Sequence, residues 1–484
     1  MNNQFSKIDV HNTLSRAIEA FKPLKPGKVT MYHCGPTVYW TQHIGNLRGM
    51  TMGDLVVRTF KYFGYEVTHV RNYTDVGHLT SDSDTGEDKM EKGAKREGLS
   101  PREIADKYIA LFERDTRALN LLEPTHKPRA TEYVEQMILL VQDLVRKGFG
   151  YATDLAVYFD VRKFPTYTRL SGQNLDQLIS GAGSADVTDP AKHSPLDFAL
   201  WFFKAGIHEK ALQSWESPFS SPLVKNGEGF PGWHIECSAM SRSLLGETID
   251  IHMGGIEHIP VHHTNEIAQS EGASGKKFVD YWLHNEHLVV NNEKMAKSQG
   301  TGFSLQEIID KGYDPLVLRY FFLGAHYRSK QNFTWEALDA SANGLAELRK
   351  RYNELKLRNQ EGAKLSEQAL ALKDKFDAAL AADFNIPQAL ATAWETAKSN
   401  VQPAEKYSLL AGFDAALGLD LESFAAKSDR IQDIPASVRE LLDEREQARK
   451  AKQFAQSDAL RSRIEQMGFL IEDAGDGPKL RKKQ

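Results

Sequence analysis

Cysteine is scarce in this chain. Its 484 residues include only Cys34 and Cys237, so no network of disulfides can stabilise the fold. Two thiols in a chain of this length predict a protein of a reducing compartment. Long apolar runs are also absent, and the polar residues 1–7 show no apolar core of a secretory signal. These absences predict a cytoplasmic protein that does not bind a membrane.

A large charge excess is also missing. Lys and Arg number 60 against 65 Asp and Glu, which gives a formal net charge of -5. A nucleic-acid partner therefore cannot be inferred from bulk charge and would have to be held by local basic patches. The 41% hydrophobic and 26% charged residues are ordinary for a globular protein. At roughly 100–200 residues per domain, the length predicts two to four domains.

The first pattern along the chain is a strand, a turn, a helix and a second strand. Residues 28–34 are strand-like and end at a Gly-Pro break, the apolar spacing of 44–63 predicts a helix, and 67–70 is again strand-like. This order predicts a βαβ unit with a parallel sheet. Ligands of such sheets bind beyond the carboxyl ends of the strands, which is where Cys34 lies.

The remaining chain divides by composition. Residues 121–230 mix helix and strand signals, and we interpret them as an insertion between two halves, 1–120 and 231–315, of a nucleotide-binding domain. Beyond these halves the pattern is almost wholly helical, and the end of the chain is typical of a short hairpin. The candidate helices cover residues 315–323, 335–357, 366–382, 387–400, 436–450 and 453–467.

His43, Ile44, Gly45 and Asn46 stand at the start of the predicted helix after the first strand. A helix N-terminus offers unpaired N–H groups and the positive end of the helix dipole, which suits phosphate. Gly45 lets the backbone approach a ligand closely. His43 and Asn46 are about one turn apart, so both can face the same ligand. Taken alone, these residues are as typical of a polar helix start without a ligand.

A second candidate phosphate-binding element is Lys294-Met295-Ala296-Lys297-Ser298, on a loop that glycines follow. Two lysines and a hydroxyl on such a loop suit a triphosphate and would stabilise the charge that develops as pyrophosphate leaves. Lysines on surface turns are common without any ligand, so this motif alone is modest support for a nucleotide site.

Together, the two motifs resemble in order and context the signature motifs of class I aminoacyl-tRNA synthetases, HIGH and KMSKS. Here they read HIGN and KMAKS. Asn46 keeps a polar donor where the family has His, whereas Ala296 loses one hydroxyl. The resemblance implies that His43, Asn46, Lys294 and Lys297 are catalytic and act with Mg²⁺ on bound ATP.

Cys34, Cys237, His262 and Glu266 form a candidate metal site. If the segment around His262 is helical, His262 and Glu266 are four residues apart and share one face. Two thiolates, an imidazole and a carboxylate complete a tetrahedral zinc site. The sequence contains no Cys-x-x-Cys pair, so spacing alone favours two buried structural cysteines.

The segments around these residues resemble the cysteine-specific family of class I synthetases. The matching stretches include MYHCGPTVY at 31–39, PGWHIECSAM at 231–240, HHTNEIAQS at 262–270 and DFN at 383–385. The resemblance covers essentially the whole chain. It implies one zinc ion per chain, bound by Cys34, Cys237, His262 and Glu266. His234, His252 and His263 are expected to be packing or hydrogen-bonding histidines.

A zinc site in the amino-acid pocket would explain selection of cysteine. A hydrophobic pocket separates nearly isosteric side chains by only about 1–3 kcal/mol. Zinc, in contrast, binds thiolate far better than hydroxyl. The metal would therefore distinguish cysteine from serine directly, and no editing domain is expected.

The resemblance also implies substrate-binding residues. For ATP they are Gly35, Pro36, Thr37, His43, Gly45, Asn46, Gly254, Glu257, Lys294, Lys297 and Ser298. For cysteine they are Cys34, Gly35, Thr74, Trp233 and Cys237. Glu257 stands where an Asp is more usual in the family, and the loop at 76–94 is longer than the family's compact form.

The implied fold is α/β, with a Rossmann-like parallel-sheet catalytic domain that carries a mixed α/β connective insertion. An all-α tRNA-binding region follows at 316–430, with stem-contact and bundle helices, and then a small anticodon-binding element at 431–484. The implied reaction joins L-cysteine to tRNA(Cys) through cysteinyl-adenylate, with ATP as the energy source. A monomer is expected. Basic residues at the end, which would contact phosphates, are Lys479, Arg481, Lys482 and Lys483.

Two alternatives stay open at the level of sequence. One is a ligase that joins cysteine to an amino-sugar of a small thiol and needs no anticodon-reading end; the matching segment at 448–468 argues against it. The other is a non-catalytic paralogue that binds zinc or tRNA. The intact His43, Lys294 and Lys297 argue against that reading.

Overall fold

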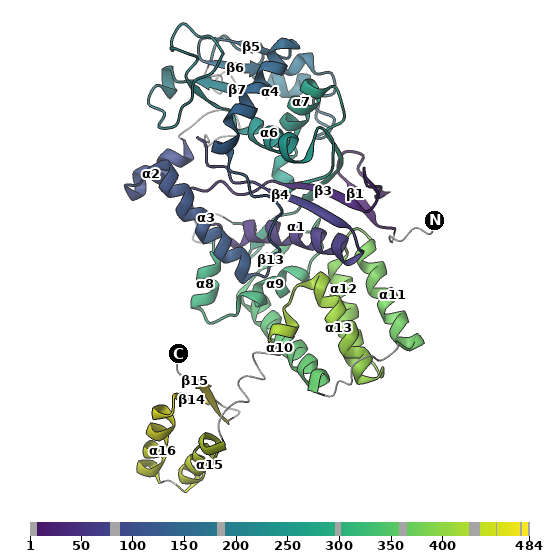
Figure 1. Cartoon of the computed structure of the whole chain (residues 1–484), viewed down its shortest axis with the longest axis vertical. Coiled ribbons are helices and arrows are strands. Elements are labelled where there is room, and N and C mark those ends of the chain that lie inside the picture. Colours follow the sequence, from purple (N-terminus) through teal and green to yellow (C-terminus); the bar gives the residue numbers. More distant parts are fainter. Residues whose placement is uncertain are drawn as a thin grey trace.

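The structure, a computed structural model, describes most of the chain. The described residues are 7–77, 88–181, 189–295, 302–357, 365–424, 436–451, 453–474 and 477–482. Figure 1 shows a central sheet with the insertion on one side and the helical region on the other. Within the described ranges, no helix is both long and apolar enough to cross a membrane.

The central sheet has four parallel strands in the order β10-β9-β3-β4, which confirms the predicted parallel sheet. α1 joins β3 to β4, and α7 joins β9 to β10, so the strand–helix–strand unit predicted at 28–70 is confirmed. Pairing of β3 with β9 unites two units that are far apart in the sequence. The elements are β3 (Lys28–His33), α1 (Ile44–Tyr62), β4 (Glu66–Arg71), β9 (Ile249–Gly255), α7 (His262–Ser274) and β10 (Val279–Asn285).

The two faces of this sheet belong to different hydrophobic cores. Successive side chains of a strand point to opposite faces. Val29 and Met31 of β3 pack in the core that includes α1 and α9 (Pro315–Leu323). Tyr32 and Cys34 pack in the other core, with α7 and two further helices, α4 (Val134–Arg146) and α6 (Trp233–Leu245). Cys34 therefore emerges on the α6 and α7 side.

The insertion is a small antiparallel sheet with helices around it. Its strands lie in the order β5-β6-β7-β8, and α4 lies within residues 121–230, for which mixed helix and strand signals were noted. β7 is buried on both faces and was not predicted, because a continuous apolar run does not alternate. The strands are β5 (Gly150–Ala152), β6 (Ala156–Phe159), β7 (Phe198–Phe203) and β8 (Gly229–Pro231).

Two helices link β4 to the insertion. α2 (Lys89–Glu97) begins at an Asp88 cap, and α3 (Pro101–Ala118) begins at a capping box formed by Ser100 and Glu103. These helices pack against each other (Figure 1). α2 begins at the edge of the candidate site described below.

The helical region confirms most of the predicted helices and corrects two points. One correction is α13, which was not predicted: it packs against α1, α10, α11 and α12, so its apolar residues do not form a single stripe. The other is β13 (Gln331–Phe333), a short strand within the region expected to be helical, which pairs with β11 (Leu288–Val290). The helices besides α9 are α8 (Leu305–Asp310), α10 (Trp335–Leu357), α11 (Glu367–Ala381), α12 (Ile386–Lys398) and α13 (Pro403–Leu417).

The end of the chain forms its own small unit. Helices α15 (Ala436–Lys450) and α16 (Phe454–Gln466) pack together, and β14 (Phe469–Ala474) pairs with β15 (Gly477–Lys482) in a hairpin. A separate hydrophobic core holds them, with Ile464 fully buried. Both helices and the hairpin were predicted from the sequence (Figure 1).

Candidate active site and metal centre

Cys34 lies at the carboxyl end of β3, where the strand meets β9. Its N–H donates to the Met253 carbonyl of β9 at 3.1 Å. The next residue must be glycine, because a Cβ at Gly35 would lie 1.7 Å from the carbonyl oxygen of Asn72. The Gly35 N–H instead donates to Asn72 Oδ1 at 2.8 Å. This close approach holds Cys34 at the edge of the sheet where ligands of parallel sheets bind.

Cys34, Cys237, His262 and Glu266 form a buried cluster in which one ligand atom of each lies within 4.8 Å of the others. Cys237 lies on α6, and His262 and Glu266 are one turn apart on α7, as their spacing predicted. His262 Nε2 is 3.0 Å from Glu266 Oε1, and Cys34 Sγ is 3.9 Å from the same oxygen. Two sulfurs, an imidazole and a carboxylate are a donor set that suits tetrahedral zinc.

A second set of side chains meets the same distance condition: Cys34, His252, His263 and Glu266. It contains only one sulfur, so it suits a soft cation less well. Its histidines instead support the first set, since His252 Nε2 lies 2.8 Å from Glu266 Oε2 and His263 Nε2 lies 3.4 Å from Cys34 Sγ. Such contacts orient metal ligands. The expectation that His234 is a hydrogen-bonding histidine agrees with its Nδ1, 2.9 Å from His262 Nδ1.

The four side chains of the cluster share protons unequally, and burial raises the pKa of the Cys34 thiol well above its ordinary value. A hydrogen bond from Cys34 lowers the pKa of Cys237 to about 6, although burial opposes this. Burial acts to raise the pKa of Glu266, but His252 and His262 hold that pKa well below its ordinary value. Burial likewise acts to lower the pKa of His262, yet the Glu266 carboxylate and the Cys237 thiol raise it to about 10. A bound cation that prefers sulfur would replace the protons that these side chains share through their hydrogen bonds.

His43 caps α1, and Asn46 completes the cap. The Asn46 N–H donates to His43 Nδ1 at 3.1 Å, and the His43 N–H donates to Asn46 Oδ1 at 3.3 Å. This capping box fixes the first turn of α1. The Ile44 N–H donates to the Phe303 carbonyl at 2.8 Å, which ties the helix start to the chain beyond the KMAKS segment. A Cβ at Gly45 would lie 3.4 Å from Met295 Cε, so the described start of the second candidate also lies beside this helix start.

A cavity of about 580 Å³ connects the metal cluster to this helix start. Trp233 lies along it, with its ring centroid 4.4 Å from that of His262. Predicted residues that line the cavity are Cys34, Gly35, Pro36, Thr37, His43, Gly45, Asn46, Thr74, Trp233, Cys237, Gly254, Glu257 and His262. Lys294 lies in β12 (Glu293–Lys294), just before Met295 of the lining. Lys297 and Ser298 are outside the described residues.

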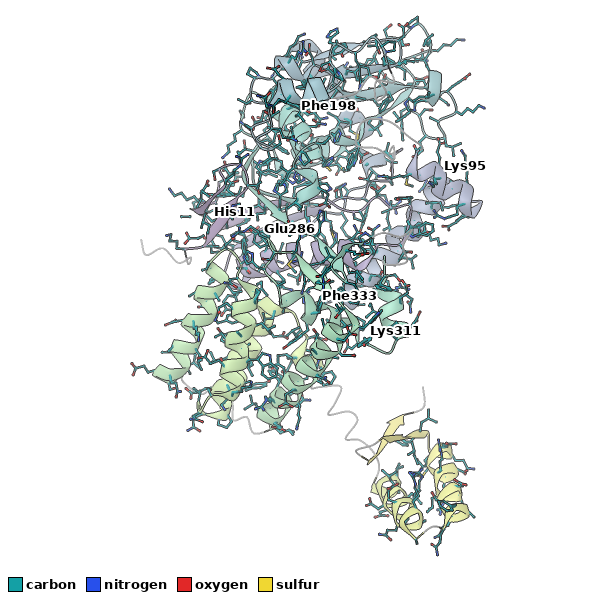
Figure 2. The ribbon with its side chains drawn as sticks, turned by 180° about the vertical axis from the view of Figure 1, so that it is seen from behind. His11, Lys95, Phe198, Glu286, Lys311 and Phe333 are labelled. Atoms are coloured by element: carbon teal, nitrogen blue, oxygen red, sulfur yellow. The ribbon has the colours of Figure 1, made fainter. Side chains whose placement is uncertain are left out.

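The sequence reasoning missed several residues of the same cavity. Asn285 ends β10, an edge strand of the central sheet, and Glu286 and His287 follow it; Figure 2 labels Glu286. The rule that ligands bind at the carboxyl ends of parallel strands was a signal that could have found them. Lys89, the first residue of α2, also lines the cavity, and no motif pointed to it.

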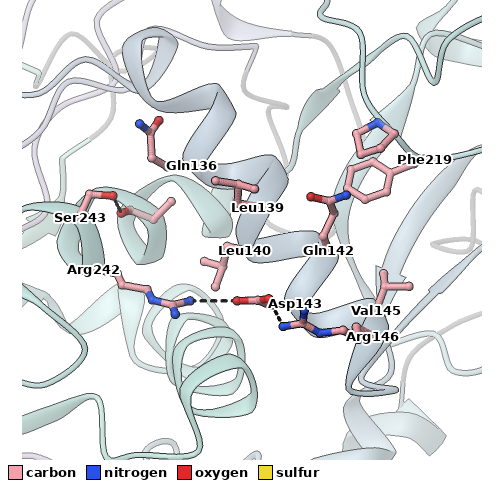
Figure 3. Close-up of a pocket in the computed structure, with 12 residues that line it drawn as sticks. Gln136, Leu139, Leu140, Gln142, Asp143, Val145, Arg146, Phe219, Arg242 and Ser243 are labelled. Atoms are coloured by element: carbon pink, nitrogen blue, oxygen red, sulfur yellow. Dashed lines mark hydrogen bonds and ion pairs between the residues drawn. The ribbon is translucent and has the colours of Figure 1, made fainter.

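A larger cavity, of about 840 Å³, lies elsewhere, between α4 and α6. Its twelve lining residues include no histidine and no cysteine. Its charged side chains bond to one another: Asp143 pairs with Arg242 at 3.5 Å and with Arg146 at 2.5 Å (Figure 3). The smaller cavity, which contains the converging sulfurs and imidazole, is therefore the candidate active site.

Two family models match the chain. The catalytic domain of class I (C) tRNA synthetases matches residues 20–343, and the anticodon-binding domain of cysteinyl-tRNA ligases matches residues 432–481. The first match contains the whole cluster and cavity described above. The second coincides with the unit formed by α15, α16 and the hairpin.

Curated relatives match over nearly the full length. The cysteine–tRNA ligase of Treponema denticola is 42% identical over 96% of this chain and 98% of its own. Cysteine–tRNA ligase 1 of Burkholderia lata is 44% identical over 98% of this chain and 96% of its own. Identity at this level over whole chains indicates a shared family.

Solved structures share the fold at low identity. A complex of LeuRS with tRNA from Agrobacterium radiobacter K84 superposes with a TM-score of 0.62, at 13% identity, over 84% of this chain and 86% of the other. Methionyl-tRNA synthetase of Mycobacterium tuberculosis bound to methionyl-adenylate superposes with a TM-score of 0.54, at 14% identity, over 84% of this chain and 90% of its own. These likenesses confirm the predicted fold class.

Proposed function

The chain belongs to the cysteine–tRNA ligase family of class I tRNA synthetases, and from this premise we propose how its own residues perform the ligation. The substrates are ATP, L-cysteine and tRNA(Cys). The cysteine carboxylate attacks the α-phosphate of ATP and releases pyrophosphate, and a terminal adenosine hydroxyl of the tRNA then takes the cysteinyl group. No protein nucleophile is needed, so catalysis is positioning and charge stabilisation.

Cys34, Cys237, His262 and Glu266 would hold one zinc ion. The donor set fits this metal, because two thiolates select a soft cation and four convergent ligands satisfy its tetrahedral preference. When bound, the ion supplies a preference for the substrate's thiolate over a hydroxyl, which separates cysteine from serine. Trp233, whose ring lies next to that of His262, would cover the substrate side chain, and Thr74 would line the same pocket.

The start of α1 would bind the phosphates of ATP. The positive end of its dipole favours anions, and Gly45 leaves room for a close approach. We also assign Lys294, Lys297 and Ser298 to the triphosphate, with Mg²⁺, because this segment leads from β12 toward the chain that bonds to the helix start. Gly35, Gly254 and Glu257 line the same cavity and complete the nucleotide site.

The remaining chain would bind tRNA. Residues 316–430 are assigned to the stem and 431–484 to the anticodon; the match of an anticodon-binding domain at 432–481 supports the second assignment. That match also disfavours an amino-sugar ligase, which needs no such unit. From the scarcity of cysteine we further propose that the protein works in the cytoplasm. We also propose that it works as a monomer.

One observation carries the proposal: the two sulfurs, the imidazole and the carboxylate converge, and the sulfurs and the imidazole line the cavity that the start of α1 also lines. The test is cysteine-dependent exchange of pyrophosphate into ATP, measured beside zinc content. We expect one zinc per chain, exchange with cysteine, and exchange with serine at least about 100-fold weaker. Equal exchange with the two amino acids would contradict the zinc-based selection.

The phosphate assignment has its own test. Lys297→Ala removes a charge that stabilises the leaving pyrophosphate, so exchange should fall by about 100-fold or more while zinc content is unchanged. Lys330→Ala, which removes an exposed lysine next to β13, is the matched control and should exchange at the wild-type rate. Wild-type exchange by Lys297→Ala would remove this lysine from the mechanism.

A further inference from the structure

Lys89 on α2 has no role in the assignments above, although it lines the active-site cavity. We propose that its ammonium group binds the α-carboxylate of the cysteine substrate and so determines that the substrate is an amino acid rather than a simple thiol. This inference rests on the proposed function, since it concerns the same pocket. It adds a recognition element for the carboxylate, a part of the substrate that the metal does not bind.

The position of α2 brings Lys89 to the rim of the pocket. Asp88 caps the helix by accepting from the N–H groups of Met90 and Glu91 at 2.7 and 3.0 Å. Gly93 packs so closely on the segment after β3 that a Cβ there would lie 3.2 Å from the Tyr39 carbonyl oxygen. The first turn of α2 is therefore held against the catalytic domain, with Lys89 as its first residue.

The other side of α2 is held by the insertion. Glu91 accepts a hydrogen bond from the Leu212 N–H at 2.9 Å. The side chain of the next residue, Gln213, donates to the Asp75 carbonyl at 3.0 Å. The start of α2 is thus fixed between two parts of the structure, so Lys89 has a defined place and is not simply a side chain on a free surface.

The side chain of Lys89 and the metal cluster both lie near the same aromatic ring. Its Nζ lies 5.9 Å from the centroid of the Trp233 ring. The same ring lies 4.4 Å from the ring of the metal-ligand candidate His262. In cysteine, only Cβ and Cα separate the sulfur from the carboxyl carbon. A substrate whose sulfur is at the cluster and whose side chain is covered by Trp233 therefore places its carboxylate within reach of the Lys89 ammonium.

The charges of the cavity single out this residue. Among the described residues that line it, Lys89 is the only lysine or arginine, whereas Glu257 and Glu286 are carboxylates. A carboxylate that enters a partly buried pocket loses hydration and needs a charged partner. Lys89 is the described lining residue whose charge meets that need.

The contact acts on binding and not on the chemical step. One carboxylate oxygen forms the new bond to the α-phosphorus, the bond from that phosphorus to the pyrophosphate oxygen breaks, and pyrophosphate leaves with the electron pair. The carboxylate loses its charge in this step, so its attraction to Lys89 is strongest before the reaction. Removal of the ammonium should therefore raise the KM for cysteine and should not lower kcat.

The test compares cysteine with cysteamine, which has the same thiol and amine but no carboxylate. Their dissociation constants are measured by calorimetry on zinc-loaded protein, and exchange kinetics are measured beside them. In the wild type, cysteamine should bind about 10- to 100-fold more weakly than cysteine, the value of one charged hydrogen bond. In Lys89→Met and Lys89→Gln, cysteine binding should weaken by that factor and cysteamine binding should not change.

Two further variants complete the design. Lys89→Arg keeps the charge and should recover most of the preference for cysteine. Lys95→Met removes an exposed lysine from the same helix, at a position that does not line the cavity (Figure 2), and should behave as the wild type. A preference for cysteine that survives in Lys89→Met and Lys89→Gln, or an equal loss for both ligands, overturns the proposal.

The same experiment separates this inference from the function on which it rests. A wild type without cysteine-dependent exchange would show that the proposed function is wrong. A wild type that exchanges normally, with a Lys89→Met variant whose only change is a raised KM for tRNA, would show that Lys89 serves the nucleic acid. That result also overturns the proposal.

Discussion

Two buried clusters of ionisable side chains lie on opposite sides of the central sheet, and they differ in how their polar atoms are satisfied. The metal cluster comprises Cys34, Cys237, His262 and Glu266, on the side of α6 and α7. The second, which we call the arginine joint, comprises Asp54 and Arg58 of α1 and Arg319 of α9. Both are almost completely buried.

In the arginine joint, each charged group has its partners within the protein. Asp54 Oδ2 accepts from Arg58 Nε at 2.8 Å and from Arg319 Nη2 at 2.7 Å, and Oδ1 accepts from the Leu122 N–H at 2.8 Å. Arg319 Nε donates to the Leu417 carbonyl at 2.8 Å. The joint therefore ties α1 and α9 to the end of α13 and needs no ligand.

The metal cluster converges instead on a shared centre. Its ligand atoms are mainly acceptors, and the groups that lower the pKa of Glu266 are the imidazoles of His252 and His262. Burial and charge alone therefore do not mark a functional site. What distinguishes the site is a set of acceptors that point at one another and can be satisfied together only by protons or by a cation.

The largest effect is expected from a substitution that disrupts the metal cluster. Cys237→Ser replaces a sulfur by a hydroxyl that binds zinc poorly, so zinc content should fall far below one per chain. Cysteine-dependent exchange should fall on the order of 1,000-fold, because thiol recognition and orientation are lost together. Elemental analysis and the exchange assay measure the two quantities on the same preparation.

A neighbouring variant is the control for this change. Ser238 is also buried on α6, but its hydroxyl bonds to Gln269 at 2.7 Å and not to the cluster. Ser238→Ala should keep zinc and exchange at near wild-type levels. Full zinc content and full exchange in Cys237→Ser would show that the cluster is not the metal site.

The next effect breaks the arginine joint. Asp54→Asn removes the carboxylate charge and leaves two buried guanidinium groups without their anion. Loss of one partner of a buried ion pair costs about 3–5 kcal/mol of unfolding free energy. We expect a large fall in the denaturation midpoint of the catalytic domain, with zinc content and exchange per folded molecule preserved at low temperature.

An exposed ion pair gives the matched control for Asp54→Asn. Glu347 and Arg351 pair at 2.7 Å across one turn of α10, with both side chains more than one third exposed. Glu347→Gln should change the unfolding free energy by no more than about 0.5 kcal/mol. A similarly small loss in Asp54→Asn would mean that the carbonyl contacts alone neutralise the two arginines.

Much of the fold follows from patterns that the sequence displays locally. The break after residue 34 and the apolar spacing of α1 predict the first βαβ unit, and the helical pattern of residues 335–357 and 453–467 predicts α10 and α16. α13 escaped because it is enclosed by other helices and shows no stripe. β13 escaped because it gains its partner, β11, only from the tertiary fold.

The site shows the same division. The spacing of His262 and Glu266 predicts their shared helix face, and this was confirmed. Spacing could not unite them with Cys34 and Cys237, because their approach depends on the pairing of β3 with β9 between distant segments. The resemblance to a known family supplied that step. It did not supply Lys89, whose place depends on how α2 is fixed between the catalytic domain and the insertion.

The smallest expected effect concerns the dependence of stability on pH. It follows from a comparison of two buried histidines, His262 and His69. His262 faces a carboxylate and a thiol, and its pKa is raised to about 10. His69 lies on β4 with its Nε2 unpartnered among the described residues, and burial lowers its pKa to about 3. Below about pH 6.5, the unfolded chain therefore binds a proton at His69 that the folded protein does not.

This difference predicts how acid affects stability. Because the unfolded state binds more protons, the unfolding free energy falls as the pH drops below about 6.5. Between pH 7.5 and pH 5.5, the titration of His69 lowers the unfolding free energy by about 1.4 kcal/mol. In His69→Leu, the fall in unfolding free energy from pH 7.5 to pH 5.5, measured by denaturation, should be smaller than in the wild type by this amount. The two proteins also differ in stability at pH 7.5, so the comparison is between their changes with pH. An unchanged pH slope would mean that His69 accepts its proton in the folded state and that burial alone does not keep this imidazole neutral.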